Sequence, residues 1–238
     1  MRRKTTAVRI GNVVLSSEEP VLVQSMLNTS TREVDACVEQ AIRIIEAGGR
    51  LADADRRQSS KRFEGVDARE IHRRLRERGY TTPISADIHF VAEAASVAAR
   101  YVEKVRINPG NFADKRATFK KLTYTDEEYA AELEILRQKF TEFLEVCRQY
   151  GTAVRIGTNH GSLSDRIMSR YGDTPAGMVE ATMEYLRVCQ ACDFKDVVIS
   201  LKSSDCRTMV DAVRLLVEKM EAEGMCYPLH LGVTEAGE

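Results

Sequence analysis

The sequence predicts an α/β protein built as a parallel barrel, and two observations carry this prediction. Short apolar segments rich in β-branched residues each end in polar residues, at 84–90, 105–111, 153–163, 197–205 and 229–237. Sequence with helical periodicity lies between them. Strands that alternate with helices and end in polar groups are typical of a TIM-type (β/α)8 barrel. We expect one barrel domain over residues 1–238, with an N-terminal hairpin and with the chain ending before the last barrel strand.

Composition and charge exclude several classes of protein. The chain has 238 residues, of which 43% are hydrophobic and 30% charged, as in ordinary globular domains. Its formal net charge of −1 creates no global field for nucleic acid or an anionic membrane. No apolar run approaches the roughly 20 residues of a membrane span, and no apolar signal segment follows the basic start. We expect a cytoplasmic protein that binds neither nucleic acid nor membrane.

The cysteines predict neither disulfides nor a metal site. We expect reduced thiols, most of them on apolar helix faces. Cys189 and Cys192 have the spacing of a metal-binding or redox pair, but no second pair lies at zinc-finger distance. The sequence therefore assigns no metal ligand in this chain.

The first fifth of the chain predicts a hairpin, a strand and a helix. Residues 7–15 alternate around the turn Gly11-Asn12, which predicts a short hairpin; by analogy with other barrels it would plug the bottom. The first barrel strand is expected over 21–26. A capping box at Ser30–Glu33 opens a helix that Gly48-Gly49 ends.

Residues 51–65 are the one place where the local sequence contradicts the architecture. A second strand should follow the first helix, but this stretch is charged and lacks β-branched residues. Regular alternation resumes after it, and gives about seven barrel strands in all. We expect helices over 67–78, 91–100, 174–190 and 207–223, and strands over 84–90, 104–107, 196–201, 228–232 and from Ala153 onward.

A long insertion over 112–150 interrupts the alternation. Residues 108–111 before it, Asn-Pro-Gly-Asn, are expected to be a loop. Thr125 and Glu128 have the spacing of a capping box, and an apolar stripe from Tyr129 to Cys147 predicts a helix that faces the core.

Polar residues at the carboxyl ends of the predicted strands would meet on one rim of the barrel. Such a cup of cations and hydrogen-bond donors suits a diphosphate, because guanidinium groups bind phosphate oxygens in pairs. The expected binding residues are His89, Arg106, Asn108, Arg155, Asn159, His160, Lys202 and Ser203. Gly110, Gly157 and Gly161 would let backbone amides approach the phosphates.

Two carboxylates, Asp87 and Glu235, share that rim. Each could move protons on a substrate hydroxyl, or could be a salt-bridge partner of the arginines. His72 lies in a charged helix and is expected to be exposed, whereas His230 lies inside a strand and is expected to pack in the core. The sequence carries no dinucleotide-binding fingerprint, Walker A loop, nucleophile elbow or zinc-helix motif.

Five motifs occur in order along the chain: Val23-Gln-Ser-Met26, Ala86-Asp-Ile-His-Phe90, Val105-Arg-Ile-Asn-Pro-Gly-Asn111, Val154-Arg-Ile-Gly-Thr-Asn-His-Gly-Ser-Leu163 and Leu229-His-Leu-Gly-Val-Thr-Glu-Ala-Gly237. Together they resemble the 4-hydroxy-3-methylbut-2-enyl diphosphate synthase (IspG/GcpE) family. The insertion at 112–150 resembles the long, three-domain form of that family.

The resemblance implies an iron–sulfur oxidoreductase of non-mevalonate isoprenoid biosynthesis, which reductively opens 2-C-methyl-D-erythritol 2,4-cyclodiphosphate with loss of water. Electrons would come from ferredoxin or flavodoxin through a [4Fe-4S] cluster, held by three Cys and one Glu of a separate C-terminal domain. By the same resemblance, Glu235 and Asp87 would handle protons. A homodimer is an open alternative for the oligomeric state. The diphosphate or the ring would be bound by His89, Arg106, Asn108, Arg155, Asn159 and Lys202.

The sequence departs from the family pattern at two places. It ends shortly after Glu235, so we expect the last strand and the cluster domain to be absent and this polypeptide alone to be inactive. An arginine of the family's second strand falls on Asp53, where a carboxylate would repel phosphate. This indicates a local reading-frame error across 51–66 or a genuine lesion, which resequencing the coding DNA would decide.

Two other functions stay open at this point. One is a phosphate-binding barrel transferase similar to dihydropteroate synthase, and the other is an inactive barrel that only binds a ligand or a partner.

Overall fold

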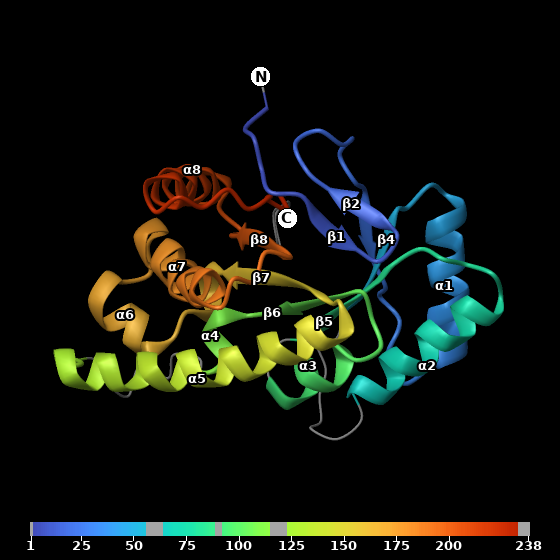
Figure 1. Cartoon of the computed structure of the whole chain (residues 1–238), viewed down its shortest axis with the longest axis horizontal. Helices are drawn as coiled ribbons and strands as arrows, with labels where there is room; N and C mark the ends of the chain where they lie inside the picture. Colours follow the sequence, from blue (N-terminus) through green and yellow to red (C-terminus); the bar gives the residue numbers. More distant parts are fainter. Residues whose placement is uncertain (1, 56–63, 89–91, 115–122, 233–238) are drawn as a thin grey trace.

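The computed structural model describes residues 2–55, 64–88, 92–114 and 123–232, without the side chains of 51–55 and 64–67. Within these ranges six parallel strands form one sheet, in the same order as in the chain (Figure 1). They are β3 (Gln24–Met26), β4 (Leu51–Asp55), β5 (Ile84–Ile88), β6 (Lys104–Ile107), β7 (Ala153–Asn159) and β8 (Val197–Lys202). A sequential parallel order with helical crossovers is the topology of a TIM-type barrel, which confirms the predicted fold class.

Helices cover the outer face of this sheet (Figure 1). They are α1 (Val34–Glu46), α2 (Glu64–Glu77), α3 (Ala92–Ala98), α4 (Pro109–Phe112), α5 (Asp126–Tyr150), α6 (Asp165–Tyr171), α7 (Pro175–Ala191) and α8 (Cys206–Ala222). Alternate strand residues face them and are apolar, as Val105 and Ile107 of β6 and Val154 and Ile156 of β7 show. The remaining strand positions face the barrel interior.

The predicted hairpin forms and closes the amino-terminal end of the barrel. Strands β1 (Val8–Ile10) and β2 (Val13–Leu15) pair antiparallel. The buried side chains of Val8 and Ile10 form a separate apolar cluster with Ala153 of β7 and Val198 of β8. Since these are the first interior positions of their strands, the apolar part of the barrel interior lies at this end.

Strand β4 forms where the local sequence lacks a strand signal. Ala52 pairs with Ser25 on one side and with Ile84 on the other, and Asp53 pairs with Met26 and Ser85. Backbone hydrogen bonds from two neighbouring strands therefore override the local composition, and the architecture gains its second strand. The side chain of Asp53 and residues 56–63, on which the reading-frame hypothesis falls, lie outside the described part of the chain.

The insertion forms α5, and its predicted start is confirmed. Glu128 N donates to Thr125 Oγ1 at 3.2 Å, and Thr125 N donates to Glu128 Oε2 at 3.0 Å, which completes the capping box. Aromatic side chains then hold α5 against α4 and α7. The rings of Phe140 and Tyr185 are 4.8 Å apart, and those of Phe112 and Phe143 are 5.4 Å apart.

Three local predictions are wrong, and one short helix was missed. Helix α1 begins at Val34, and its N-cap Glu33 makes no side-chain capping bond, so the box at Ser30–Glu33 does not form. Residues 109–112 form the short helix α4 rather than a loop, and 165–171 form the unpredicted α6. The strand expected over 228–232 is reduced, in the described residues, to one parallel bridge between Ile199 and Leu229.

The cysteines are only partly where they were expected. Cys37, Cys147 and Cys189 are buried, Cys192 is half-buried, and Cys206 and Cys226 are exposed. Burial raises the pKa of Cys189 well above the usual thiol value, which disfavours a reactive thiolate in the Cys189–Cys192 pair. None of the helices in the described ranges has the length and the apolar character that crossing a bilayer requires.

Candidate functional site

Charged side chains occupy much of the barrel interior, instead of the branched apolar residues that usually fill it. Asp87 of β5, Lys104 and Arg106 of β6, and Arg155 of β7 are each at most 4% exposed. Lys104 Nζ donates to Gln24 Oε1 of β3 at 2.6 Å. Because charges are costly to bury unless they are paired, this group marks a site rather than an ordinary core.

Asp87 bridges the two arginines. Its Oδ1 accepts from Arg106 Nη1 at 2.7 Å, and its Oδ2 accepts from Arg155 Nη2 at 3.2 Å. Arg106 Nη2 also donates to the carbonyl of Gly157 at 2.8 Å and to Asn159 Oδ1 at 3.2 Å. One carboxylate thus orients two guanidinium groups, which supports the salt-bridge interpretation of Asp87.

Among the described residues, four cations gather at this interior. Lys104, Arg106 and Arg155 are buried there with the carboxylate of Asp87, and Lys202 acts together with Arg155 and Lys104 on the imidazole of His230. Lys202 ends β8 opposite Asn159, so it lies at the same end of the barrel. Cations in a partly enclosed space interact with an anion more strongly than the same cations on a surface.

His230 belongs to this group, and the prediction that it packs in the apolar core is wrong. It is only half-buried, and its backbone N donates to Ile199 O at 2.7 Å. Desolvation, followed by the charges of Arg155 and Lys104, lowers its pKa from 6.5 to about 3. The imidazole is therefore neutral at neutral pH, and it reports the positive field around it.

Asn108 holds two loops together. Its Oδ1 accepts from Gly110 N at 3.2 Å and so caps α4, while its Nδ2 donates to Ser162 Oγ at 2.8 Å. Its side chain is 2% exposed. Both polar groups of the side chain are thus engaged with the protein in this structure, although Asn108 lies at the end of β6 as predicted.

His160 and Ser203 also join loops. His160 Nε2 lies 3.0 Å from Asp173 Oδ1, and its Nδ1 lies 3.4 Å from Ser203 Oγ. Ser203 Oγ accepts from the backbone N of Asp205 at 3.1 Å. These contacts connect the segments that follow β7 and β8 with the segment before α7.

Two of the three glycines expected near the phosphates are packed closely against the protein, and the approach of their amides to phosphate stays a prediction. A Cβ atom on Gly110 would stand 1.5 Å from the Ser162 carbonyl oxygen, and one on Gly157 would stand 2.3 Å from Arg106 Nε. Both glycines are therefore required by close protein packing. Gly161 has open space around it, with no atom within 4 Å of its built Cβ.

His72 is not simply exposed, as was predicted. Its Nε2 lies 2.8 Å from Glu103 Oε1, and Arg76 Nη2 donates to the same oxygen at 2.7 Å. This is a structural cluster, since Glu103 also accepts from the backbone N of Ile84. His89 and Glu235, the remaining predicted site residues, lie outside the described ranges.

The described residues do not fit an iron–sulfur cluster. In the ranges that the structure describes, no three His, Cys, Asp or Glu side chains gather as a metal site. We derive no step through a cluster held by these residues.

Two of the three interior cations on β6 and β7 were predicted, whereas Lys104 was missed. A signal for it was present, because Lys104 and Arg106 are two residues apart in an apolar strand and so face the same side. His230 has no comparable signal, since its environment comes from Arg155 and Lys104 on other strands.

The fold and the site together define a TIM-type barrel domain with buried charged side chains in its interior. A family model described as GcpE TIM-barrel domain matches residues 5–238, and the chain belongs to this family. The protein named 4-hydroxy-3-methylbut-2-en-1-yl diphosphate synthase (flavodoxin) of Parabacteroides distasonis is 57% identical over 237 residues. The chloroplastic, ferredoxin-type synthase of Oryza sativa subsp. japonica is 49% identical over 237 residues.

The chain is shorter than these relatives. The matches cover all of this chain, but only 38% of the Parabacteroides protein and 32% of the rice protein. Activities, substrates and partners in their names therefore describe longer proteins.

Solved structures of low sequence identity share the fold alone. A type I 3-dehydroquinate dehydratase from Clostridium difficile gives a TM-score of 0.55 at 9% identity, over 97% of this chain and 81% of that one. The Plasmodium falciparum HPPK-DHPS protein gives 0.53 at 10% identity, over 96% of this chain and 40% of that one. The likeness to a dihydropteroate synthase thus extends to the barrel and carries no functional weight.

Proposed function

We propose that the protein acts in the reductive ring opening and dehydration of 2-C-methyl-D-erythritol 2,4-cyclodiphosphate to 4-hydroxy-3-methylbut-2-enyl diphosphate, and that this chain supplies the barrel that binds the diphosphate. The names of its relatives support the reaction. The observation that supports the binding role is the pair Arg106 and Arg155, both held by the carboxylate of Asp87 in the buried interior that also contains Lys104.

The cations have a defined task in this reaction. Conversion consumes two electrons and two protons and releases water, and one C–O bond between the ring carbon and the diphosphate breaks. Negative charge grows on the departing phosphate oxygen as that bond breaks. Arg106, Arg155 and Lys202 would stabilise it, because preorganised cations in a water-poor site cost little reorganisation.

Asp87 orients the arginines in this proposal. Both of its oxygens accept guanidinium hydrogen bonds, so its geometry favours orientation over proton transfer. Proton transfer is assigned to Glu235, together with a contribution of His89 to ligand binding, on the motif resemblance. Asn108, Asn159, His160 and Ser203 shape the loops around the ligand.

Electron supply is proposed for the whole protein. The relatives are named for flavodoxin and for ferredoxin, and either carrier is the proposed donor. A [4Fe-4S] cluster, bound outside the described residues, is the proposed relay. Such a cluster would supply single electrons to the substrate.

The activity is tested on the natural full-length protein that carries this chain. The protein is incubated anaerobically with the cyclodiphosphate and a chemical reductant, with the Parabacteroides relative as a positive control. Formation of 4-hydroxy-3-methylbut-2-enyl diphosphate is expected, together with its loss in Arg106→Gln. No product, in conditions where the relative turns over, overturns the proposed reaction.

A further inference from the structure

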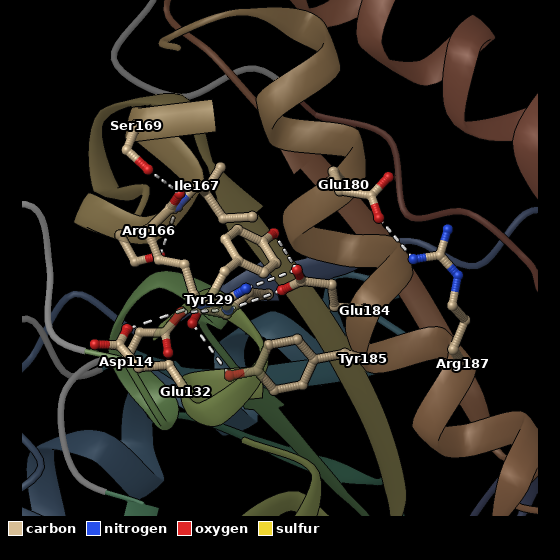
Figure 2. Close-up of polar contacts among 12 residues, drawn as sticks. Asp114, Tyr129, Glu132, Arg166, Ile167, Ser169, Glu180, Glu184, Tyr185 and Arg187 are labelled. Atoms are coloured by element: carbon tan, nitrogen blue, oxygen red, sulfur yellow. Dashed lines mark hydrogen bonds and ion pairs between the residues drawn. The ribbon is translucent and has the colours of Figure 1, made fainter. Parts of the chain in front are cut away.

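A second buried arginine lies outside the barrel interior. Arg166 of α6 is 1% exposed, and its guanidinium pairs with Glu184 of α7 through two hydrogen bonds, of 2.7 and 2.8 Å (Figure 2). Its Nη2 also donates to Asp114 Oδ2 at 2.7 Å. A bidentate ion pair of this kind fixes the relative orientation of the two segments that it joins, as well as the distance between them.

The insertion helix α5 closes this cluster. Tyr129 donates its hydroxyl hydrogen bond to Glu184, and its ring centroid lies 4.6 Å from the Arg166 guanidinium carbon (Figure 2). Burial raises the pKa of the Tyr129 hydroxyl far above its usual value, so it stays a donor at any physiological pH. The cluster therefore joins four separate segments of the chain.

Two of these segments follow the strands that carry the arginines of the interior. Asp114 lies two residues after α4, and α4 begins directly after Asn108 at the end of β6. Arg166 lies in the first turn of α6, a few residues after the end of β7. The Arg166–Asp114 pair thus ties the segment after Arg106 to the segment after Arg155.

Closer contacts show that the two segments touch. Asn108 Nδ2 donates to Ser162 Oγ at 2.8 Å, and the Gly110 backbone packs directly against the Ser162 carbonyl. A shift of one segment would therefore move the other, and would also move Asn159, whose Oδ1 accepts from Arg106. The ion pairs of Arg166 with Asp114 and Glu184 hold the two segments in this contact.

We propose that Arg166 is a positioning residue that sets the geometry of the diphosphate site from outside the barrel. It fixes residues 108–112 and 159–163 relative to each other, and Tyr129 extends this support to α5. The part that concerns ligand affinity rests on the proposed function. The part that concerns the two segments stands on the contacts alone.

The test compares three variants of the natural full-length protein. Arg166→Met removes the charge, Arg166→Lys keeps the charge but loses the bidentate geometry, and Arg187→Met is the matched control. Arg187 also bridges carboxylates, Glu223 at 2.8 Å and Glu180 at 2.6 Å, but it joins α7 to α8 away from the two segments. Backbone hydrogen exchange of 108–112 and 159–163 is measured for each, together with inorganic pyrophosphate affinity.

Faster exchange in both segments and a loss of affinity of at least about tenfold are expected for Arg166→Met, because small displacements weaken a preorganised site. Arg166→Lys should lie between Arg166→Met and the wild type, and Arg187→Met should leave both readouts unchanged. Equal exchange in the Arg166→Met and Arg187→Met variants overturns the proposal, as does faster exchange with unchanged affinity. A wild-type protein that binds no pyrophosphate refutes the proposed function instead, and the exchange data then decide the positioning role.

Discussion

Gly157 lies directly against the side chain of Arg106: a Cβ atom at Gly157 would stand 2.3 Å from Arg106 Nε and 3.1 Å from its Cγ. The side chain of Arg106 therefore crosses the neighbouring strand β7 where that strand has no side chain. The space at Gly157 lets the guanidinium reach the Gly157 carbonyl and Asn159 of β7, while it also pairs with Asp87 of β5 on the other side. The absence of a side chain at Gly157 of β7 thus makes room for the side chain of Arg106 from β6.

Replacing Gly157 with Ala should displace Arg106 and weaken binding of an anion. The new methyl group would overlap the guanidinium stem, which would break the 2.8 Å bond to the Gly157 carbonyl. We expect a loss of unfolding free energy of about 1–3 kcal/mol, measured by urea titration, and a weaker pyrophosphate affinity.

Gly161→Ala is the control for this change. No atom lies within 4 Å of its built Cβ, so stability and affinity should stay close to the wild type. Equal stability and equal pyrophosphate affinity of Gly157→Ala and Gly161→Ala would show that Arg106 does not need the space left at Gly157.

Replacing Asp87 with Asn should destabilise the free protein more than the liganded one. Both guanidinium groups lose their shared charge partner, and breaking a buried ion pair costs about 3–5 kcal/mol. Pyrophosphate supplies substitute oxygens, so the rise in melting temperature on adding it should be larger for the variant. A variant that is as stable as the wild type would contradict the bridging role of Asp87.

His230 should make the protein less stable as the pH falls. The ordinary pKa of a histidine side chain is 6.5, whereas that of His230 in the folded protein is about 3. Below pH 6.5 the unfolded chain therefore binds a proton that the folded chain does not. Its contribution is fully present above pH 6.5 and is lost progressively toward pH 3.

His230→Gln should remove this dependence. Between pH 6 and pH 4 the slope of unfolding free energy against pH should differ between wild type and variant by up to about 1.4 kcal/mol per unit, which is one proton. Urea unfolding at several pH values measures it. Parallel curves for the two proteins would mean that the pKa of His230 is not lowered in the folded protein.

The hairpin that closes the barrel should matter for stability. Ile10 is 1% exposed in the apolar cluster with Ala153 and Val198, and Ile10→Ala should cost about 2–5 kcal/mol of unfolding free energy. Val14 on the same hairpin is 37% exposed, and Val14→Ala should cost much less. Similar thermal unfolding of the two variants would mean that the hairpin does not close the barrel.

The local sequence predicted most of the barrel, because short stretches of residues carry the hydrophobic periodicity of strands and helices and the capping residues of helices. The helix at 174–190, the capping box at Thr125 and the hairpin at 7–15 all depend on such signals, and the structure confirms them. Strand β4 could not be predicted this way. Its backbone is held by β3 and β5, and this pairing is a tertiary effect that its own composition opposes.

The sequence predicted several residues of the site, but it did not predict most of the contacts between them. The structure brings Arg106, Arg155 and Asp87 together, as strand-end reasoning suggested, while their contact with a ligand stays a prediction. The roles of Asn108 and Gly157 depend on Ser162 and Arg106, which are distant in sequence. Such contacts cannot be inferred from spacing along one strand.

The central claim is that the charged interior of the barrel binds a diphosphate. Titration calorimetry of the natural full-length protein with 2-C-methyl-D-erythritol 2,4-cyclodiphosphate tests it most directly, with the unphosphorylated sugar as control. We predict binding of the diphosphate alone, which weakens as salt is raised and is lost in Arg155→Met. Absence of binding, or equal binding of the unphosphorylated sugar, would contradict the account.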